Sequence, residues 1–197
     1  MKLQIQKSTL ETDLIKACKK QNARAQRLLY EKYASSMLGL CRRYVRGDME
    51  AEDVMIRGFM KVFSKIKLFE GKGSFEGWMK RIMVNEALGY LRKNKAMYLE
   101  TDIDVADKEP DFGMLDSVLE AKDLLNMIND LPSGYRTVFN LYAIEGYAHK
   151  EIGELLGINE NTSKSQLSRA RMHLQRKLLE AEQLLEKKKI NQDGKKA

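Results

Sequence analysis

The stretch that decides the fold is residues 145–178, which read EGYAHKEIGELLGINENTSKSQLSRARMHLQRKL. Gly157 separates two helical patterns here, and a glycine tolerates the positive φ angle that ends a helix. Gly153 is small enough for a second helix to cross closely, and Asn159 or Asn161 could cap that helix. A supporting helix, a tight turn and a second helix that enters the major groove define a helix-turn-helix. The stretch therefore predicts a DNA-binding helix-turn-helix.

The predicted second helix has an apolar face and a polar face. Its apolar residues share one side at about 100° per residue and would face inward: Leu167, Ala170, Leu174 and Leu178. Residues 161–177 carry five basic groups and no acidic group, whereas an ordinary solvated helix interleaves both signs. Hydroxyl, amide and guanidinium side chains reach base edges or phosphates. The opposite side holds such groups, from which we expect DNA contacts: Thr162, Ser165, Gln166, Arg169 and Arg176.

The net charge of the 197-residue chain is +7, and it is distributed unevenly. Residues 1–97 carry +11, residues 98–118 carry −6 and residues 119–197 carry +2. A basic–acidic–basic order indicates two parts that face a polyanion, joined by a segment that is itself polyanion-like.

Helical periodicity accounts for most of the chain before and after the acidic segment. Asn22 could cap a long helix, Asp48 could cap the next one, and a third begins near Phe75. The third helix carries a mixed second stripe: Trp78, Arg81, Asn85, Leu88 and Arg92.

These patterns predict an all-α fold of two small helical domains joined by an acidic flexible linker, the second domain being the helix-turn-helix. The predicted boundaries are 10–97 for the first domain, 98–114 for the linker, 115–186 for the second domain and 187–197 for a basic disordered tail.

Several classes of protein are disfavoured. No apolar run reaches the ~18 residues of a membrane span, and the N-terminal residues lack the apolar core of a signal peptide. The two cysteines, Cys18 and Cys41, are isolated and indicate buried thiols in a reducing cytoplasm. His149 and His173 have no partners at ligand spacing, so we expect surface imidazoles, no metal site and no cofactor. Phosphate-binding glycine motifs and catalytic triads are missing, so we expect no enzyme and no catalytic residue.

The motifs quoted above resemble those of a known family, the extracytoplasmic-function (ECF) class of sigma-70-type RNA polymerase sigma factors. The second half matches through EGY followed by KEIGELLGI, the turn, and TSKSQLSRAR. The first half matches through DMEAEDVMIRGFMKVF and FEGKGSFEGWMKRIMVNEALGYLRKNK. The resemblance covers about residues 20–97 and 115–180, and AEDV with SFEGW and TSKSQLSRAR is similar to the Bacteroidetes branch.

The resemblance implies an alternative sigma factor that directs core RNA polymerase to promoters through −10 and −35 elements. Helix 48–67 would dock on the β′ clamp helices, with the β flap as a second polymerase contact. The docking candidates are Asp48, Glu52, Asp53, Phe59 and Phe63, of which the phenylalanines would rather pack the domain. The family usually has Gln-Glu where Ile56 and Arg57 stand, and Arg57 alters the charge of the docking set.

Loop 69–75 would hold a base flipped out of the −10 element, because glycine lets the backbone approach a nucleotide closely. The implied −10 residues are Lys72, Gly73, Ser74, Trp78, Arg81, Asn85 and Arg92, with core packing as the alternative for Trp78. The implied −35 residues are Thr162, Lys164, Ser165, Gln166, Ser168, Arg169 and Arg176.

The remaining expectations concern partners. The acidic linker would thread near the polymerase active site and RNA exit path, or would be a plain solvated spacer. An anti-sigma factor would clamp on or between the two domains, and the free protein would be a monomer. The alternative function is a stand-alone helix-turn-helix regulator that binds DNA without polymerase.

Overall fold

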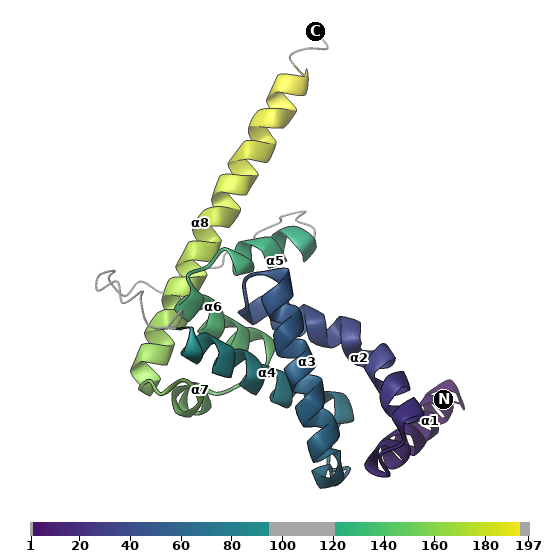
Figure 1. The fold of residues 1–197 in the computed structure, drawn as a ribbon. Helices are drawn as coiled ribbons and strands as arrows, with labels where there is room; N and C mark the ends of the chain where they lie inside the picture. The colour runs from purple at the N-terminus through teal and green to yellow at the C-terminus, as the bar shows by residue number, and fades with distance from the viewer. Residues whose placement is uncertain (1, 95–120, 194–197) are drawn as a thin grey trace. The chain divides into compact units, whose positions relative to one another are not determined.

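The computed structural model describes residues 2–94 and 121–193, which fold into two compact units, Met1–Asn94 and Lys95–Ala197. Every regular element in the described residues is a helix (Figure 1). The all-α fold of two small helical domains is therefore confirmed. The predicted acidic linker, 98–114, lies outside the described residues.

Unit 1 consists of four α-helices and one short turn of 3₁₀ helix. The α-helices are α1 (Lys2–Lys19), α2 (Ala23–Tyr44), α3 (Asp48–Lys65) and α4 (Phe75–Lys93), with η1 (Ile66–Leu68) after α3. Helices α2, α3 and α4 pack against one another, and α1 packs on α2 (Figure 1). Their inward faces follow the predicted helical period, since Leu29, Met37, Val54 and Met79 are all fully buried.

The ends of these helices agree with the sequence at one cap and differ at another. The Asn22 side chain accepts a hydrogen bond from the Ala25 N–H at 2.9 Å, so it caps α2 as predicted. The prediction that Asp48 caps α3 is wrong, because Asp48 is already helical and Gly47 holds the cap position. The cap position has a φ angle of 98°, which glycine adopts readily and aspartate does not.

The helix α1 is absent from the sequence prediction, which begins the first long helix after Asn22. The missed helix packs on α2, and among its described side chains Ile15 and Cys18 are buried. Two positions three residues apart are too few to establish a helical period in that part of the helix.

Unit 2 contains α5 (Ala121–Asn129), α6 (Ser133–Phe139), η2 (Asn140–Ile144), α7 (His149–Leu156) and α8 (Glu160–Asp193). Its core joins α5, α6 and α8 through a cluster of buried residues, Ile128, Leu131, Tyr135, Ala170 and Leu174. The helix α8 continues well past the other helices of the unit (Figure 1).

The predicted basic tail, 187–197, overlaps the end of α8. Residues 187–193 are the last two turns of α8, which ends at Asp193. No proline or glycine interrupts the sequence between Gly157 and Gly194, and Lys, Glu, Gln and Leu all favour helix. Residues 194–197 lie outside the described part of the chain.

Candidate nucleic-acid and polymerase interface

The turn between α7 and α8 has the geometry of a helix-turn-helix. Gly157 ends α7 in the left-handed conformation, with φ of 70°. A Cβ on Gly153 would lie 2.7 Å from the backbone oxygen of Ile158, so the turn itself packs against α7 there. Asn159, rather than Asn161, caps α8, because its side chain accepts from the Thr162 N–H at 2.6 Å. Each feature fixes the angle at which α8 leaves the turn.

The buried face of α8 agrees with the prediction, since Leu167, Ala170 and Leu174 are at most 5% exposed. Leu178, at the end of this face, is half-buried. The apolar face holds α8 on unit 2, and Lys164 and Ser165 are exposed on the opposite side of its first turns.

The predicted DNA-contacting residues of α8 differ in how freely they are presented. Lys164, Ser165 and Arg176 are exposed, whereas Thr162, Gln166, Ser168 and Arg169 are half-buried. The Gln166 amide lies beside Gly134 in the first turn of α6, since a Cβ on Gly134 would be 3.6 Å from it. The Ser165 hydroxyl donates to the Asn161 carbonyl at 3.0 Å. When no DNA is bound, Ser165 therefore has a hydrogen-bond partner within its own helix, and the Gln166 amide lies close to the backbone of α6.

Acidic residues outside the segment 161–177 pair with three of its five basic groups. Lys164 pairs with Glu160 at 2.7 Å, Lys177 with Asp130 at 2.6 Å, and Arg176 approaches Glu180 at 3.9 Å. In each pair at least one of the two side chains is exposed, so the ion pair is weak and the basic group can contact a DNA phosphate instead. The absence of acidic residues thus applies to the segment 161–177 alone. The folded surface around that segment carries both positive and negative charges.

A polar cluster at the start of α7 was not found from the sequence. The Nδ1 of His149 lies 2.9 Å from the hydroxyl of Ser163, which is fully buried in α8. The His149 ring stacks on Tyr142 with centroids 4.5 Å apart, and Arg171 lies over the same Tyr142 ring. His173 is also half-buried and contacts the Tyr135 ring. Both histidines thus keep part of their surface exposed, as expected of surface imidazoles, but each also packs on an aromatic ring.

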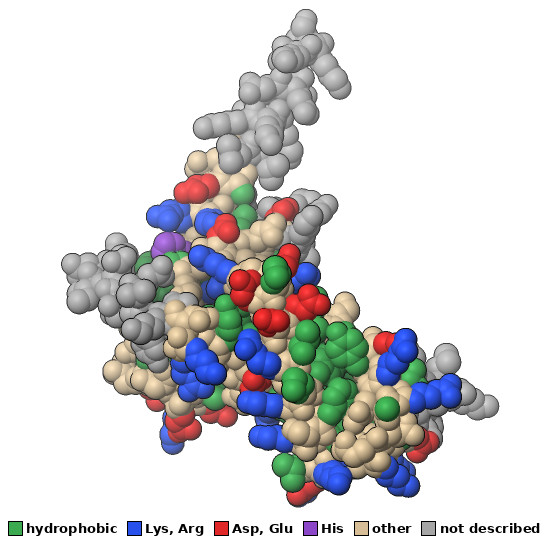
Figure 2. Space-filling model, viewed as in Figure 1, with side chains coloured by type: hydrophobic (Ala, Val, Ile, Leu, Met, Phe, Trp, Pro, Cys, Tyr) green, Lys and Arg blue, Asp and Glu red, His purple; other side chains and the backbone are tan. Residues whose placement is uncertain are grey.

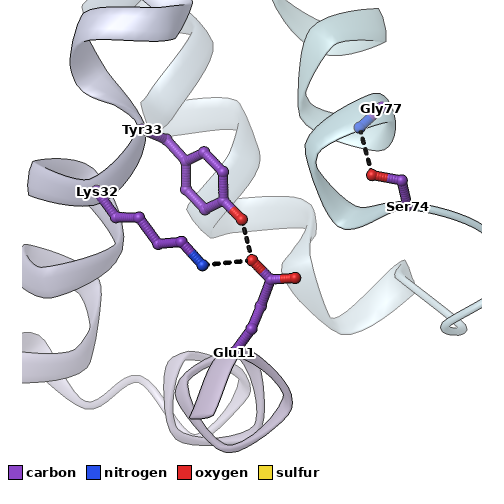
Figure 3. Close-up of polar contacts among 5 residues, drawn as sticks. All are labelled: Glu11, Lys32, Tyr33, Ser74 and Gly77. Atoms are coloured by element: carbon purple, nitrogen blue, oxygen red, sulfur yellow. Dashed lines mark hydrogen bonds and ion pairs between the residues drawn. The ribbon is translucent and has the colours of Figure 1, made fainter. Parts of the chain in front are cut away.

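The loop before α4 in unit 1 presents its middle to solvent and buries its ends. Residues 70–74 are exposed, and Gly71 and Gly73 have φ angles of 80° and 87°. No atom lies within 4 Å of a Cβ built on either glycine, so the backbone there is open to an incoming group. Lys72 pairs with Glu70 at 2.7 Å on this surface. The Ser74 hydroxyl accepts from the Gly77 N–H at 3.3 Å and so caps α4 (Figure 3).

Three aromatic rings support this loop. Phe69 and Phe75, at its two ends, have ring centroids 5.1 Å apart. Trp78 lies 5.6 Å from each of them and is nearly parallel to Phe75. Trp78 is half-buried. It therefore takes part in packing, which agrees with the alternative kept open for it, and part of its side chain remains exposed to solvent.

The mixed stripe of α4 separates into exposed and buried positions. Arg81, Asn85 and Arg92 are exposed in the structure and lie on one side of the helix, while Leu88 is 1% exposed. The three polar residues follow Trp78 along the side of α4 that begins at the loop. A strand of nucleic acid leaving the loop would meet two guanidinium groups and one amide.

The outer face of α3 combines acids with unusually exposed apolar side chains. Asp48, Glu52, Asp53 and Arg57 are exposed, and Asp48 pairs with Arg42 at 2.9 Å. Met49, Ile56 and Met60 are 81%, 45% and 67% exposed, and their spacing places them in one row. Figure 2 shows hydrophobic side chains gathered over the α2–α3 face. Phe59 is buried and Phe63 half-buried, which agrees with packing roles for both.

The described residues contain no group of three or more potential metal ligands, and none of their helices is long and apolar enough to cross a membrane. Cys18 and Cys41 are fully buried, as predicted, and burial raises the pKa of Cys41 to about 12 despite the opposing charge of Arg43.

A helix-turn-helix on one unit, with an exposed glycine loop and a cationic helix face on another, defines a two-module DNA-binding transcription factor. Family models match both modules, Sigma-70 region 2 over residues 29–97 and Sigma-70, region 4 over residues 121–174. The chain is 30% identical over 177 residues to the ECF RNA polymerase sigma factor SigW of Bacillus subtilis, covering 83% of this chain and 94% of that protein. It is 28% identical over 174 residues to RNA polymerase sigma-H factor of Pseudomonas aeruginosa, covering 82% and 90%.

The chain belongs to the ECF sigma factors of the sigma-70 family, and its function is that of an alternative sigma factor in transcription initiation. Among solved structures it is similar to the sigma factor RpoE in complex with the anti-sigma factor NepR from Bartonella quintana. That likeness has a TM-score of 0.48 and 24% identity, and covers 78% of this chain and 96% of that one.

Proposed function

We propose that unit 1 recognises and opens the −10 element while α8 of unit 2 reads the −35 element. The observation that carries this proposal is the loop 70–74, whose exposed backbone and two left-handed glycines lie at the start of the polar stripe of α4. An extruded base needs close backbone approach and an aromatic neighbour, and the loop has both in its glycines and Trp78.

On the −10 side, Lys72, Gly73 and Trp78 would hold the flipped base, and Arg81, Asn85 and Arg92 would follow the strand. Ser74 has a second task as the cap of α4: its hydroxyl oxygen accepts from the Gly77 N–H, which leaves the O–H as the group that could donate to DNA. We therefore assign Ser74 chiefly to setting the loop's exit into α4.

On the −35 side, the exposed side chains Lys164, Ser165 and Arg176 would make the first phosphate contacts. Gln166 and Arg169, with Thr162 and Ser168, would reach bases once α8 is in the groove. Arg169→Ala should weaken binding by about 1–3 kcal/mol at one base position if the residue reads a base, and equally for all sequences if it holds phosphate.

For polymerase docking we propose the row Met49, Ile56 and Met60, with Glu52, Asp53 and Arg57 beside it. Water-exposed apolar side chains at a helix surface favour burial against a partner. Asp48 supports the edge of this face through its pair with Arg42. Reversing the charges of Glu52 and Asp53 together should reduce affinity for core polymerase and leave helix content unchanged.

The proposal further places the protein in the cytoplasm, as a non-enzymatic factor without metal or cofactor and a monomer when free. The finer expectations are a Bacteroidetes-like lineage, a β-flap contact for unit 2, a path for the acidic linker along the polymerase channel, and an anti-sigma partner. Capture of β′ and β on the immobilised full chain tests the polymerase contacts directly.

The deciding experiment is run-off transcription with core polymerase and a genomic promoter library, with and without the purified full chain. We expect promoter-specific transcripts that share −10 and −35 sequences. Sequence-specific DNA binding with neither stimulated initiation nor β′ capture would instead establish the stand-alone regulator.

A further inference from the structure

The helix α1 contacts Phe69 at the start of the loop 70–74 and reaches Phe75 at its end through Tyr33 of α2, although α1 lies outside the residues matched by the family model. The match to region 2 begins at residue 29, whereas α1 spans Lys2–Lys19. The family match therefore does not describe what α1 touches, and the contacts of α1 converge on the loop.

The first contact is at the start of the loop. The Lys19 ammonium donates to the backbone carbonyl of Phe69 at 2.5 Å and lies 5.9 Å from the centre of the Phe69 ring. Phe69 is 8% exposed and directly precedes the exposed loop residues. One cation at the end of α1 thus fixes both the backbone and the ring of the residue from which the loop departs.

The second contact is on the side where the loop ends. The carboxylate of Glu11 accepts hydrogen bonds from the Tyr33 hydroxyl and from Lys32, the latter at 2.6 Å (Figure 3). The Tyr33 ring meets Phe75 edge-on with centroids 6.2 Å apart, and Phe75 is the residue after the loop. Glu11 therefore positions Tyr33, and Tyr33 packs on the loop's second end.

The charge state of Glu11 supports this arrangement. Partial burial raises the pKa of Glu11, but the hydrogen bonds from Lys32 and Tyr33 outweigh it, and the net pKa lies below the ordinary value. The carboxylate is thus ionised at neutral pH, when it is the stronger acceptor.

We propose that α1 is a brace for the −10 loop, in which Lys19 and Glu11 are positioning residues that hold the two ends of residues 70–74. This inference rests on the proposed role of the loop in −10 recognition. A loop with two left-handed glycines and an exposed middle has many conformations, and ordering it on a base opposes binding. Fixing its ends in advance leaves fewer conformations to lose, so the extruded base is bound more tightly.

The test uses the full chain and two matched pairs of variants. Lys19→Met removes the first contact, and Glu11→Gln weakens the second by replacing the charged acceptor with a neutral amide oxygen. Lys16→Met and Asp13→Asn remove the same charges from the same helix at an exposed pair, whose side chains are 69% and 66% exposed. Lys19→Arg retains a cationic donor and serves as the rescue variant.

The first readout needs no DNA, because Trp78 is the one tryptophan of the chain and packs on both loop ends. Lys19→Met and Glu11→Gln should increase acrylamide quenching of Trp78 fluorescence, while the two controls and Lys19→Arg match the wild type. Far-UV circular dichroism and the unfolding midpoint of each variant show whether the fold of unit 1 is retained.

The second readout is run-off transcription from a promoter with its native −10 element and from one with that element substituted. Lys19→Met should reduce the ratio of the two by about tenfold, the size expected for one hydrogen bond to a charged group, and leave binding to a −35 duplex unchanged. Equal quenching and equal ratios for Lys19→Met and Lys16→Met would overturn the brace. Failure of the wild type itself to start transcripts specifically would overturn the proposed function instead.

Discussion

The Nδ1 of His149 and the hydroxyl of Ser163 lie 2.9 Å apart and join the two helices of the helix-turn-helix. His149 begins α7, and Ser163 lies in the first turn of α8 with no exposed surface. A buried hydroxyl needs a partner, and this one finds it across the turn. The contact therefore fixes the angle between the supporting helix and the helix that we propose reads DNA.

Replacing Ser163 by alanine should destabilise unit 2 by about 1 kcal/mol, because His149 loses the partner of its Nδ1 atom. Urea unfolding of the full chain, followed by circular dichroism, measures this change. Ser165→Ala is the matched control, since Ser165 is exposed and bonds only within its own helix turn. The interpretation fails if both variants unfold at the same urea concentration.

The pKa of His149 should lie below that of an exposed histidine. Burial lowers it first, the charges of Lys164 and Arg171 lower it further, and Glu160 opposes them only in part. Keeping His149 neutral contributes to the free energy of folding. This contribution is fully present above pH 6.5, the ordinary pKa of histidine, and is lost as the pH falls through the lowered pKa. Proton NMR resolves the two histidines of the chain, and Lys164→Gln should move the His149 titration upward. No movement would remove Lys164 as a cause.

The sequence pattern predicted those helices whose buried residues recur at the helical period. The helices α2, α3 and α4 and the apolar face of α8 all have several buried residues on one side, as expected. Gly157 was identified because one residue type meets the need for a positive φ angle. Local rules thus accounted for most of the fold and for the turn of the helix-turn-helix.

Contacts between polar residues distant in sequence could not be predicted in this way. Glu11 and Tyr33 are 22 positions apart, and Lys19 and Phe69 are 50 apart. Neither pair produces a periodic pattern in the sequence. One bond ends on a backbone carbonyl and the other begins at a hydroxyl, and both groups have many possible partners. The packing of Gln166 against Gly134 was missed for the same reason.

The two cysteines should be inert in the folded protein. Both are fully buried, and burial raises the pKa of each thiol, so the reactive thiolate is rare at neutral pH. A colorimetric thiol reagent should therefore react with neither in native buffer and with both after denaturation. Rapid reaction of one thiol in the native protein would show that its helix opens locally, and Cys18→Ser would identify which one.

Three glycine-to-alanine changes should form a ranked series, because the structure gives each glycine a different constraint. Gly153→Ala places a Cβ 2.7 Å from the Ile158 carbonyl oxygen, and backbone cannot move aside as a side chain can. We expect a loss of roughly 1–3 kcal/mol, the range for overpacking at a tight site. The α7–α8 turn would have to shift, so binding to a −35 duplex should fall as well.

Gly157→Ala meets no atom within 4 Å, but its φ of +70° is strained for any residue with a Cβ. The expected loss is about 1 kcal/mol, from conformation alone. Gly77→Ala in α4 is the control, since its nearest neighbour would be the Ser74 Cβ at an ordinary 3.7 Å and alanine favours helix. Hydrogen exchange of residues 149–174, measured by mass spectrometry on the full chain, should quicken most for Gly153→Ala, less for Gly157→Ala and not at all for Gly77→Ala. If exchange quickened more for Gly157→Ala than for Gly153→Ala, the turn would accommodate the Cβ added at residue 153 at a lower cost than the strain of a Cβ at the left-handed angle of residue 157.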